Sequence, residues 1–181
     1  MNLIMNWIRK IIQFFKILHL IYRYGLDAIL KDPLTGVFSK FLLDEFGKIE
    51  IRRAERYGLP LCIIMLDFDN LKEINDTEGH DAGDRALVKV VRVFKKIFCR
   101  ATDIFIRVGG DEFLIILVNT SESAVKELLK KVPKELKKIF LSASTGSYFW
   151  EKDMTFGQLM KKADDNLYIE KNSKKKKPDA I

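Results

Sequence analysis

A run of six apolar residues, 61–66, is followed at once by Asp67-Phe68-Asp69. A continuous apolar run of strand length is typical of a strand that is buried on both faces. Two further β-rich runs, 104–108 and 113–118, are separated by Gly109-Gly110-Asp111-Glu112, which predicts a hairpin turned by glycine, with positive φ angles at the glycine pair. Together with the helical patterns described next, these runs predict an α/β (α+β) fold with a central mixed β-sheet flanked by helices.

The helical patterns lie between and beyond the predicted strands. A chain of 181 residues fits one domain with a sizeable core. Ser39 is expected to cap the first of the helices that follow the N-terminal segment, and Gly79 to Gly83 is expected to be a turn. The expected helices are 39–57, 83–98, 121–138 and 155–171, and a last strand is expected over 140–148.

Charge and cysteine content exclude little. The formal net charge is +7, which attracts any polyanion, including a nucleotide triphosphate, nucleic acid or an anionic membrane surface, and does not choose among them. The two cysteines, Cys62 and Cys99, have neither metal-ligand spacing nor the pattern of a disulfide framework, and indicate inert thiols in a reducing cytosol.

The N-terminal segment is predicted to be an amphipathic helix. Charged residues interrupt it, so no uncharged span reaches the roughly 20 residues that a transmembrane helix needs, and no signal peptide is indicated. Three interpretations stay open: a helix packed on its own domain, a dimerising coil, and a membrane-surface helix. Dimerisation is slightly favoured. The apolar face of this predicted helix comprises Ile4, Ile8, Ile11, Phe15, Leu18 and Tyr22, and is widened by Trp7, Phe14 and Ile21.

Four carboxylates are expected to meet at one edge of the sheet. Asp67 and Asp69 end the buried strand, and Asp111 and Glu112 occupy the hairpin turn. Oxygen ligands of this kind suit Mg²⁺ or Mn²⁺ better than zinc. Metal-assisted phosphoryl or nucleotidyl transfer is therefore the leading chemistry. The competing interpretation is that these acids cap a turn or are solvated.

A second polar group has the pattern of a guanine reader. Asn75 and Asp84 frame Gly79-His80-Asp81-Ala82-Gly83. A carboxylate accepts hydrogen bonds from N1 and N2 of guanine, and adenine lacks this donor pair. The alternative is that Asp84 is a helix cap. His80 has no partner for a nucleophilic triad or a zinc site.

At these residues the sequence resembles the GGDEF family of bacterial diguanylate cyclases. Gly109-Gly110-Asp111-Glu112-Phe113 stands intact, and the family's other motifs occur in order over residues 32 to about 175, including Asp32-Pro33-Leu34-Thr35-Gly36, 67–69 and 79–84. The resemblance implies a fold like that of nucleotidyl cyclases and polymerase palm domains. It also implies condensation of two GTP into cyclic di-GMP and two pyrophosphates by a homodimer that contacts no nucleic acid.

The resemblance further implies a role for individual residues. Two divalent ions, Mg²⁺ or Mn²⁺, would be held by Asp67, the backbone carbonyl of Phe68, Asp111 and Glu112, with Asp111 and Glu112 catalytic. Arg100 and Asp103, an RxxD pair six positions ahead of Gly109, would form a product-inhibition site, although a surface ion pair is the alternative. GTP would be bound by Asn70, Leu71, Lys72, Asn75, His80, Asp84, Gly110, Lys171 and Lys175.

The chain departs from the family pattern at several places. Ser39-Lys40 stands where the family usually has Asn-Arg, and Asn70-Leu71 replaces a pair that is commonly aromatic. Lys175 replaces an arginine and lacks the glycine that precedes it in the family, and the stretch 118–144 is shorter than usual. None of these removes a proposed metal ligand or guanine reader. The expected organisation is an N-terminal helix over 1–31, the GGDEF domain over 32–175 and a basic tail over 176–181, located in the cytoplasm with contact at the inner membrane face left open. A non-catalytic receptor for cyclic di-GMP and a membrane-recruited scaffold are the alternative functions.

Overall fold

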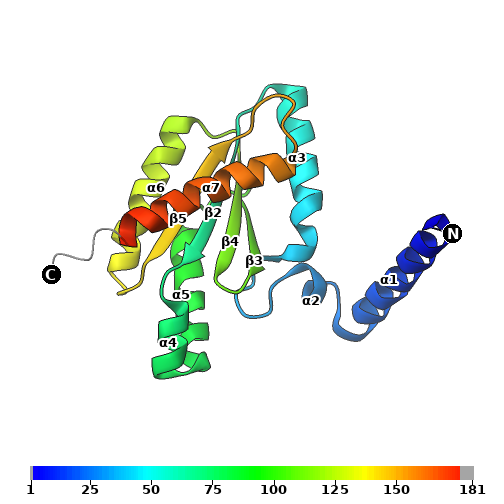
Figure 1. Cartoon of the computed structure of the whole chain (residues 1–181), viewed down its shortest axis with the longest axis horizontal. Helices are drawn as coiled ribbons and strands as arrows, with labels where there is room; N and C mark the ends of the chain where they lie inside the picture. The colour runs from blue at the N-terminus through cyan, green and yellow to red at the C-terminus, as the bar shows by residue number, and fades with distance from the viewer. Residues whose placement is uncertain (1, 176–181) are drawn as a thin grey trace.

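The structure is a computed structural model that describes the backbone of residues 2–175 and the side chains of these residues except 2–10, 20, 24, 28 and 175. The expected basic tail, 176–181, lies outside the described residues. Figure 1 shows a central sheet with helices on both faces and one helix that projects away at the N-terminal end.

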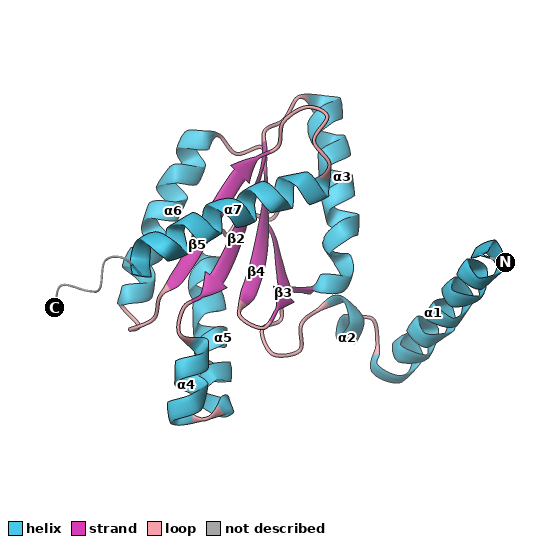
Figure 2. Cartoon of the chain, viewed as in Figure 1, coloured by secondary structure: helices cyan, strands magenta, loops and turns pink. Residues whose placement is uncertain are grey.

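The sheet has five strands in the order β1-β3-β4-β2-β5. Strand β1 pairs with β3 in parallel, and the other neighbours are antiparallel, so the sheet is mixed, as the sequence predicts (Figure 2). The central strand β2 is buried along its whole length. The strands are β1 Phe38–Ser39, β2 Leu61–Phe68, β3 Ile104–Gly109, β4 Glu112–Val118 and β5 Ala143–Phe149.

Two hydrophobic cores lie on opposite faces of this sheet. Alternate residues of β2 face opposite ways, so Ile64 and Leu66 join the core under α5 (His80–Ile97) and α6 (Glu122–Lys137). Ile63 and Met65 join the core under α3 (Leu43–Tyr57) and α7 (Phe156–Lys175). The continuous apolar run of β2 is explained by this three-layer arrangement.

The region after β2 is more helical than the sequence pattern suggests. A short helix α4 (Leu71–Glu78) was not predicted, and α5 begins at His80, so the expected turn over 79–83 is wrong except at Gly79. Gly79 has a φ of +86° and joins the two helices. Residues of this turn-rich stretch therefore sit on the first turn of a long helix.

Two local expectations are corrected. Ser39 does not cap α3, because its hydroxyl donates to the carbonyl of Ile29 and a short 3-10 helix (Lys40–Leu42) precedes α3. In the β3–β4 turn only Gly110 has a positive φ, +49°, whereas Gly109 does not. The hairpin itself is confirmed, with a register shift at its closed end.

The N-terminal helix α1 (Asn2–Tyr24) is followed by the short helix α2 (Asp27–Leu30). Figure 1 shows α1 standing away from the sheet, and several of its large apolar side chains are exposed, with Tyr22 at 90%. The structure therefore does not support the interpretation of a helix packed on its own domain. None of the helices in the described part of the chain is long and apolar enough to span a membrane.

Candidate active site

Asp67 lies at the end of β2 on the face that α7 covers. Its side chain is 9% exposed, and its Oδ2 atom lies 2.6 Å from Nζ of Lys171 on α7. In the antiparallel register Asp67 is opposite Glu112 of β4 and Ser144 of β5. A carboxylate is thus held at the end of a central strand, with the Lys171 ammonium beside it.

The electrostatic environment of Asp67 opposes its charge. Burial raises the pKa of Asp67 above its ordinary value of 3.8, and the negative charges of Asp111 and Asp69 act in the same direction. The hydrogen bond and charge of Lys171 lower the pKa but do not outweigh burial. A perturbed carboxyl beside another carboxyl is typical of a functional site.

Asp111 and Phe68 are joined across the strand ends. The Phe68 amide donates to the backbone carbonyl of Asp111 at 3.0 Å, which fixes the hairpin turn beside the end of β2. Asp111 is half-buried and Glu112 is exposed. The structure therefore places Asp111 and Glu112 of the hairpin next to Asp67 and Phe68 at the end of β2.

Asp69, the fourth carboxylate expected at this end of the sheet, lies near enough to Asp67 for its charge to raise the pKa of Asp67, but both of its oxygens have protein partners. Its Oδ1 accepts from the Ser144 hydroxyl at 2.9 Å and its Oδ2 from Lys174 at 3.2 Å, so Asp69 is engaged by protein groups. Among the described residues, no cluster of three or more His, Cys, Asp or Glu side chains has the arrangement of a metal site. Two carboxylates and a backbone carbonyl, with Glu112 adjacent, remain as an oxygen donor set that fits Mg²⁺ or Mn²⁺.

The turn between β2 and α4 has the features of a phosphate cradle. Asn70 takes a left-handed conformation with φ +63°, and no side chain caps the start of α4. The first amides of a helix lack intrahelical partners and favour anions. Leu71 packs partly in the core and Lys72 is exposed, so Asn70, Leu71 and Lys72 form one end of the candidate site.

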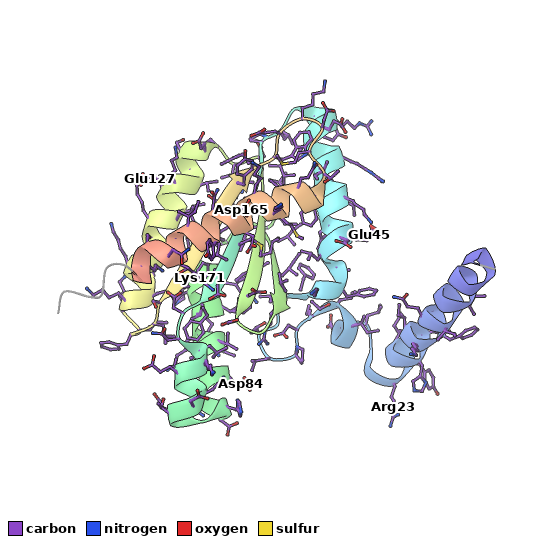
Figure 3. All side chains as sticks on the ribbon, in the orientation of Figure 1. Arg23, Glu45, Asp84, Glu127, Asp165 and Lys171 are labelled. Carbon is purple, nitrogen blue, oxygen red and sulfur yellow. The ribbon has the colours of Figure 1, made fainter. Side chains whose placement is uncertain are left out.

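The expected guanine readers lie on two adjoining helices. Asn75 on α4 is half-buried and packs so closely on Gly83 of α5 that a Cβ at Gly83 would collide with the Asn75 side-chain oxygen. His80 and Asp84 are exposed on the first turns of α5. Figure 3 shows Asp84 on α5 and Lys171 on α7, both toward the end of the sheet where β2 ends.

Arg107 is a structural residue that sequence reasoning did not single out as part of the site. Its Nε and Nη2 atoms donate to the Gly110 carbonyl at 3.0 and 2.7 Å, and Nη1 donates to both Asp32 oxygens at 3.1 Å. Asp32 also accepts from the Thr35 amide and hydroxyl. Arg107 thereby ties the Asp32–Gly36 turn to the signature hairpin, and its only sequence signal was its place just before the glycine pair.

Arg100 and Asp103 form the ion pair that was the alternative interpretation. Arg100 Nε and Nη2 lie 3.0 and 2.9 Å from Oδ1 of Asp103, whose side chain is 4% exposed. Nη2 also donates to the Val118 carbonyl at 3.1 Å and to the Thr120 hydroxyl. The Arg100 side chain is 42% exposed, so it retains an accessible face. Lys175, the last expected substrate contact, has its side chain outside the described residues.

Fold and site together define a class of protein. A mixed sheet with helices on both faces, carrying acidic residues on a buried strand end and an adjacent glycine hairpin, is a nucleotidyl-cyclase and polymerase-palm-like domain. The family model for the diguanylate cyclase GGDEF domain matches residues 29–177. The chain therefore belongs to the GGDEF family.

Known relatives agree with this assignment. Diguanylate cyclase DosC of Escherichia coli is 35% identical over 150 residues, which cover 77% of this chain and 32% of DosC, so the chain spans about a third of that relative. Diguanylate cyclase SiaD of Pseudomonas aeruginosa, solved in complex with its activator SiaC, is 29% identical with a TM-score of 0.76, covering 95% of this chain and 73% of SiaD. The coiled coil and GGDEF domain of Caulobacter crescentus DgcB, in complex with c-di-GMP, has the same fold at 22% identity, with a TM-score of 0.79 and 96% of each chain covered.

Proposed function

We propose that this chain is an active diguanylate cyclase that condenses two GTP into cyclic di-GMP and two pyrophosphates. The observation that carries the proposal is the buried Asp67 carboxylate, held beside Asp111 at the end of the central strand with Lys171 at 2.6 Å. A charge buried at this cost is retained where it binds a cation or a reacting group.

The donor set supports two divalent ions, Mg²⁺ or Mn²⁺. Asp67, Asp111 and the Phe68 carbonyl would hold them, with Glu112 adjacent, because all of these donors are oxygen atoms. When bound, such ions would activate the attacking hydroxyl and neutralise charge on the phosphoryl oxygens. Lys171 would then leave Asp67 and turn toward the triphosphate.

Each phosphodiester bond of the product would form by an in-line displacement at an α-phosphorus. The 3′-oxygen of one GTP forms a bond to the α-phosphorus of the other, while the bond from that phosphorus to the pyrophosphate oxygen breaks. The same step with the roles of the two nucleotides exchanged closes the ring and releases the second pyrophosphate. Asp111 is our candidate acceptor for the 3′-hydroxyl proton and is also a ligand. The uncapped amides at Asn70 and Leu71, with Lys72 and Gly110, would orient the phosphates.

Guanine specificity follows from Asn75 and Asp84. Asp84 would accept from N1 and N2 of guanine, and Asn75 would pair with another edge of the base. Adenine would leave the Asp84 carboxylate unpaired, which costs affinity. His80 lies four residues before Asp84 on the same helix, close enough along the helix to contact the base or ribose.

Catalysis of this kind needs two domains face to face, each with one GTP, and we assign the pairing to α1. Ile11, Phe15, Leu18 and Tyr22 recur at spacings of four and three and are exposed in the single chain, as expected of a seam that a second copy covers. Pairing would raise the effective concentration of one half-site near the other. Size measurement by light scattering, with and without residues 1–28, tests this, because an equally dimeric and active truncated chain would exclude it.

The charge of α1 favours membrane-surface contact as a second role. Arg9, Lys10 and Lys16 lie on α1, and no Asp or Glu occurs between residues 2 and 24. A wide apolar face with a basic polar face is typical of helices that lie on anionic lipid. Sedimentation with anionic and with neutral vesicles, using the full chain and the chain without residues 1–28, separates lipid binding from pairing alone.

Product inhibition at Arg100 and Asp103 is also proposed. The guanidinium is already anchored by Asp103, Val118 and Thr120, so it is oriented for a ligand on its exposed side, where a fork suits phosphate or guanine. Turnover of GTP separates an active cyclase with this site from a domain whose sole function is binding cyclic di-GMP. Arg100→Ala should abolish inhibition by added product while leaving the initial rate unchanged.

The deciding experiment is chromatography of products after nucleotide-free protein is incubated with GTP and Mg²⁺ or Mn²⁺. Asp111→Asn should remove turnover, because it loses both a ligand and the proton acceptor. Asp165→Asn, an exposed acid on α7, is the matched control and should keep full activity. Absence of cyclic di-GMP from a verified dimer would overturn the proposal and favour the receptor.

A further inference from the structure

The last turn of α7 carries a lysine whose ammonium contacts two other segments of the chain, the residue after β2 and the start of β5. Lys174 Nζ lies 2.7 Å from the Ala143 carbonyl, 3.0 Å from the Ser144 hydroxyl and 3.2 Å from Oδ2 of Asp69. Glu170, one turn earlier on α7, is 3.3 Å away. An ammonium has three hydrogens to donate, so Lys174 has no donor left over for a phosphate.

The carboxylate that Lys174 contacts is held on both oxygens. Ser144, which is fully buried, donates to Oδ1 of Asp69, and Lys174 donates to Oδ2. The Asp69 amide donates to the carbonyl of Ser142 at 3.1 Å. Asp69 thus joins the end of β2 to the start of β5, directly before the left-handed Asn70 that opens the phosphate turn.

Lys171 and Lys174 occupy different positions although they are neighbours on α7. Lys171 contacts one carboxylate, Asp67, and can exchange it for another anion. Lys174 stands at the position where the family pattern has a glycine. Its three ammonium hydrogens have acceptors on Asp69, Ala143 and Ser144. Lys171 thus pairs with a single carboxylate, whereas Lys174 links α7 to the residue after β2 and to the start of β5.

We propose that Lys174 is a positioning residue of the active site, which ties Asp69 to α7 and so fixes both the 69–72 turn and the approach of Lys171 to Asp67. The expected change in the KM for GTP rests on the proposed function, whereas the expected change in hydrogen exchange does not. In this arrangement Asp69 has a structural role, and Asp67 and Asp111 are the carboxylates that would bind ions.

The test compares Lys174→Met, which keeps the apolar stem and removes the charge, with Lys161→Met, an exposed lysine on the same helix. In nucleotide-free protein, hydrogen exchange of the peptide covering 67–73 should be at least about tenfold faster in Lys174→Met and unchanged in Lys161→Met. The KM for GTP should rise roughly tenfold, with kcat changed less than about threefold, because the ions and Asp111 are retained.

Two further variants keep the proposal falsifiable. Ser144→Ala removes the second tie to Asp69 and should give the same faster exchange, while Lys174→Arg keeps a donor cation and should restore slow exchange in part. If Lys174→Met weakens GTP binding while exchange over 67–73 stays at the wild-type rate, Lys174 contacts the nucleotide itself and the proposal is overturned. Faster exchange in Lys161→Met as well would also overturn it.

Failure of this inference is distinguishable from failure of the proposed function. The exchange measurement uses protein without nucleotide or metal ions and does not depend on turnover. A wild-type chain that makes no cyclic di-GMP, yet shows the expected exchange pattern, would overturn the cyclase and leave the positioning role of Lys174 intact.

Discussion

The Lys171 ammonium lies 2.6 Å from Oδ2 of Asp67, so a cation of the chain itself neutralises the carboxylate at the end of the buried central strand. Lysine carries this charge on a flexible stem, and its side chain is 35% exposed. The ammonium can therefore leave Asp67 without a shift of the backbone. Lys171 is positioned as an internal competitor for any divalent ion that Asp67 binds.

Replacement of Lys171 by methionine should separate ion binding from nucleotide binding. Without the competing ammonium, nucleotide-free Lys171→Met should bind Mn²⁺ about tenfold more tightly than the wild type, since one such charged contact is worth about 1.5–3 kcal/mol before its replacement by water. GTP should bind about tenfold more weakly, because a cation beside the triphosphate is lost. Calorimetric titration of each ligand measures both effects.

Lys161→Met serves as the control for this prediction, since it removes an exposed lysine from the same helix. It should leave both affinities within about twofold of the wild type. Unchanged or weaker Mn²⁺ binding by Lys171→Met would show that the ammonium does not compete with the ion.

Asp67→Asn should stabilise the protein at neutral pH while abolishing turnover. Burial raises the pKa of Asp67 above 3.8, so the folded chain holds this proton more tightly than the unfolded chain. The stabilising contribution of protonated Asp67 is fully present below pH 3.8 and is lost as the pH rises through the raised pKa of the folded state. The neutral asparagine avoids that loss, so the variant should require more urea to unfold than the wild type at neutral pH.

Urea unfolding of the wild type and Asp67→Asn across the acidic and neutral range measures this effect. The stability gain of the variant should grow with pH and shrink when Mg²⁺ is added, because the wild type alone keeps the charged ligand. A variant less stable than the wild type at neutral pH would mean that the Lys171 pair outweighs burial.

The sequence was sufficient to predict the central strand and the hairpin, since both depend on local patterns. The apolar run 61–66 required burial on both faces, and the glycine turn placed Asp111 beside the end of that strand. The proximity of Asp67 and Asp111 could therefore be expected before the structure was seen.

Contacts between distant segments could not be predicted in this way. Asp69 was expected to join the acidic cluster, but it is engaged by Ser144 and by Lys174, which lies 105 residues later. The tie between Asp32 and Arg107 spans 75 residues. Helix α4 was missed because the residue before its first turn, Asn70, has a positive φ, a conformation that local propensity does not indicate.

Asp32→Asn should destabilise the domain by roughly 1–3 kcal/mol at neutral pH, because it leaves Arg107 half-buried without its charged partner. Burial raises the pKa of Asp32, but the hydrogen bonds from Thr35 and the charge of Arg107 outweigh it, and the net pKa is lowered. The stabilisation by charged Asp32 is thus present above pH 3.8 and is lost as the pH falls through the lowered pKa of the folded state.

Thermal unfolding at neutral and acidic pH checks this prediction. The difference between the wild type and Asp32→Asn should narrow toward acid. Asp27→Asn breaks an exposed pair with Lys31 and should cost less than about 0.5 kcal/mol at any pH. Equal effects of the two substitutions would contradict a special role for the Asp32–Arg107 tie.

Gly83→Ala should weaken guanine nucleotide binding without unfolding the protein. A Cβ at this position collides with the side-chain oxygen of Asn75, which is the movable end of a side chain and can rotate away. Alanine in a helix interior also stabilises by roughly 1 kcal/mol relative to glycine, which offsets part of the strain. The expected result is a Kd for a non-hydrolysable GTP analogue raised about tenfold, with a thermal midpoint close to that of the wild type.

Gly157→Ala is the matched control, since Gly157 also lies in a helix and a Cβ there meets no atom within 4 Å. It should leave the nucleotide affinity unchanged, so any loss in Gly83→Ala cannot be attributed to helix propensity. Asn75→Ala should lower the affinity by a similar factor, and the double variant should be no worse than either single one, because both substitutions remove the same contact. Full affinity in Gly83→Ala would mean that Asn75 does not read guanine, and base recognition would then rest on Asp84 alone.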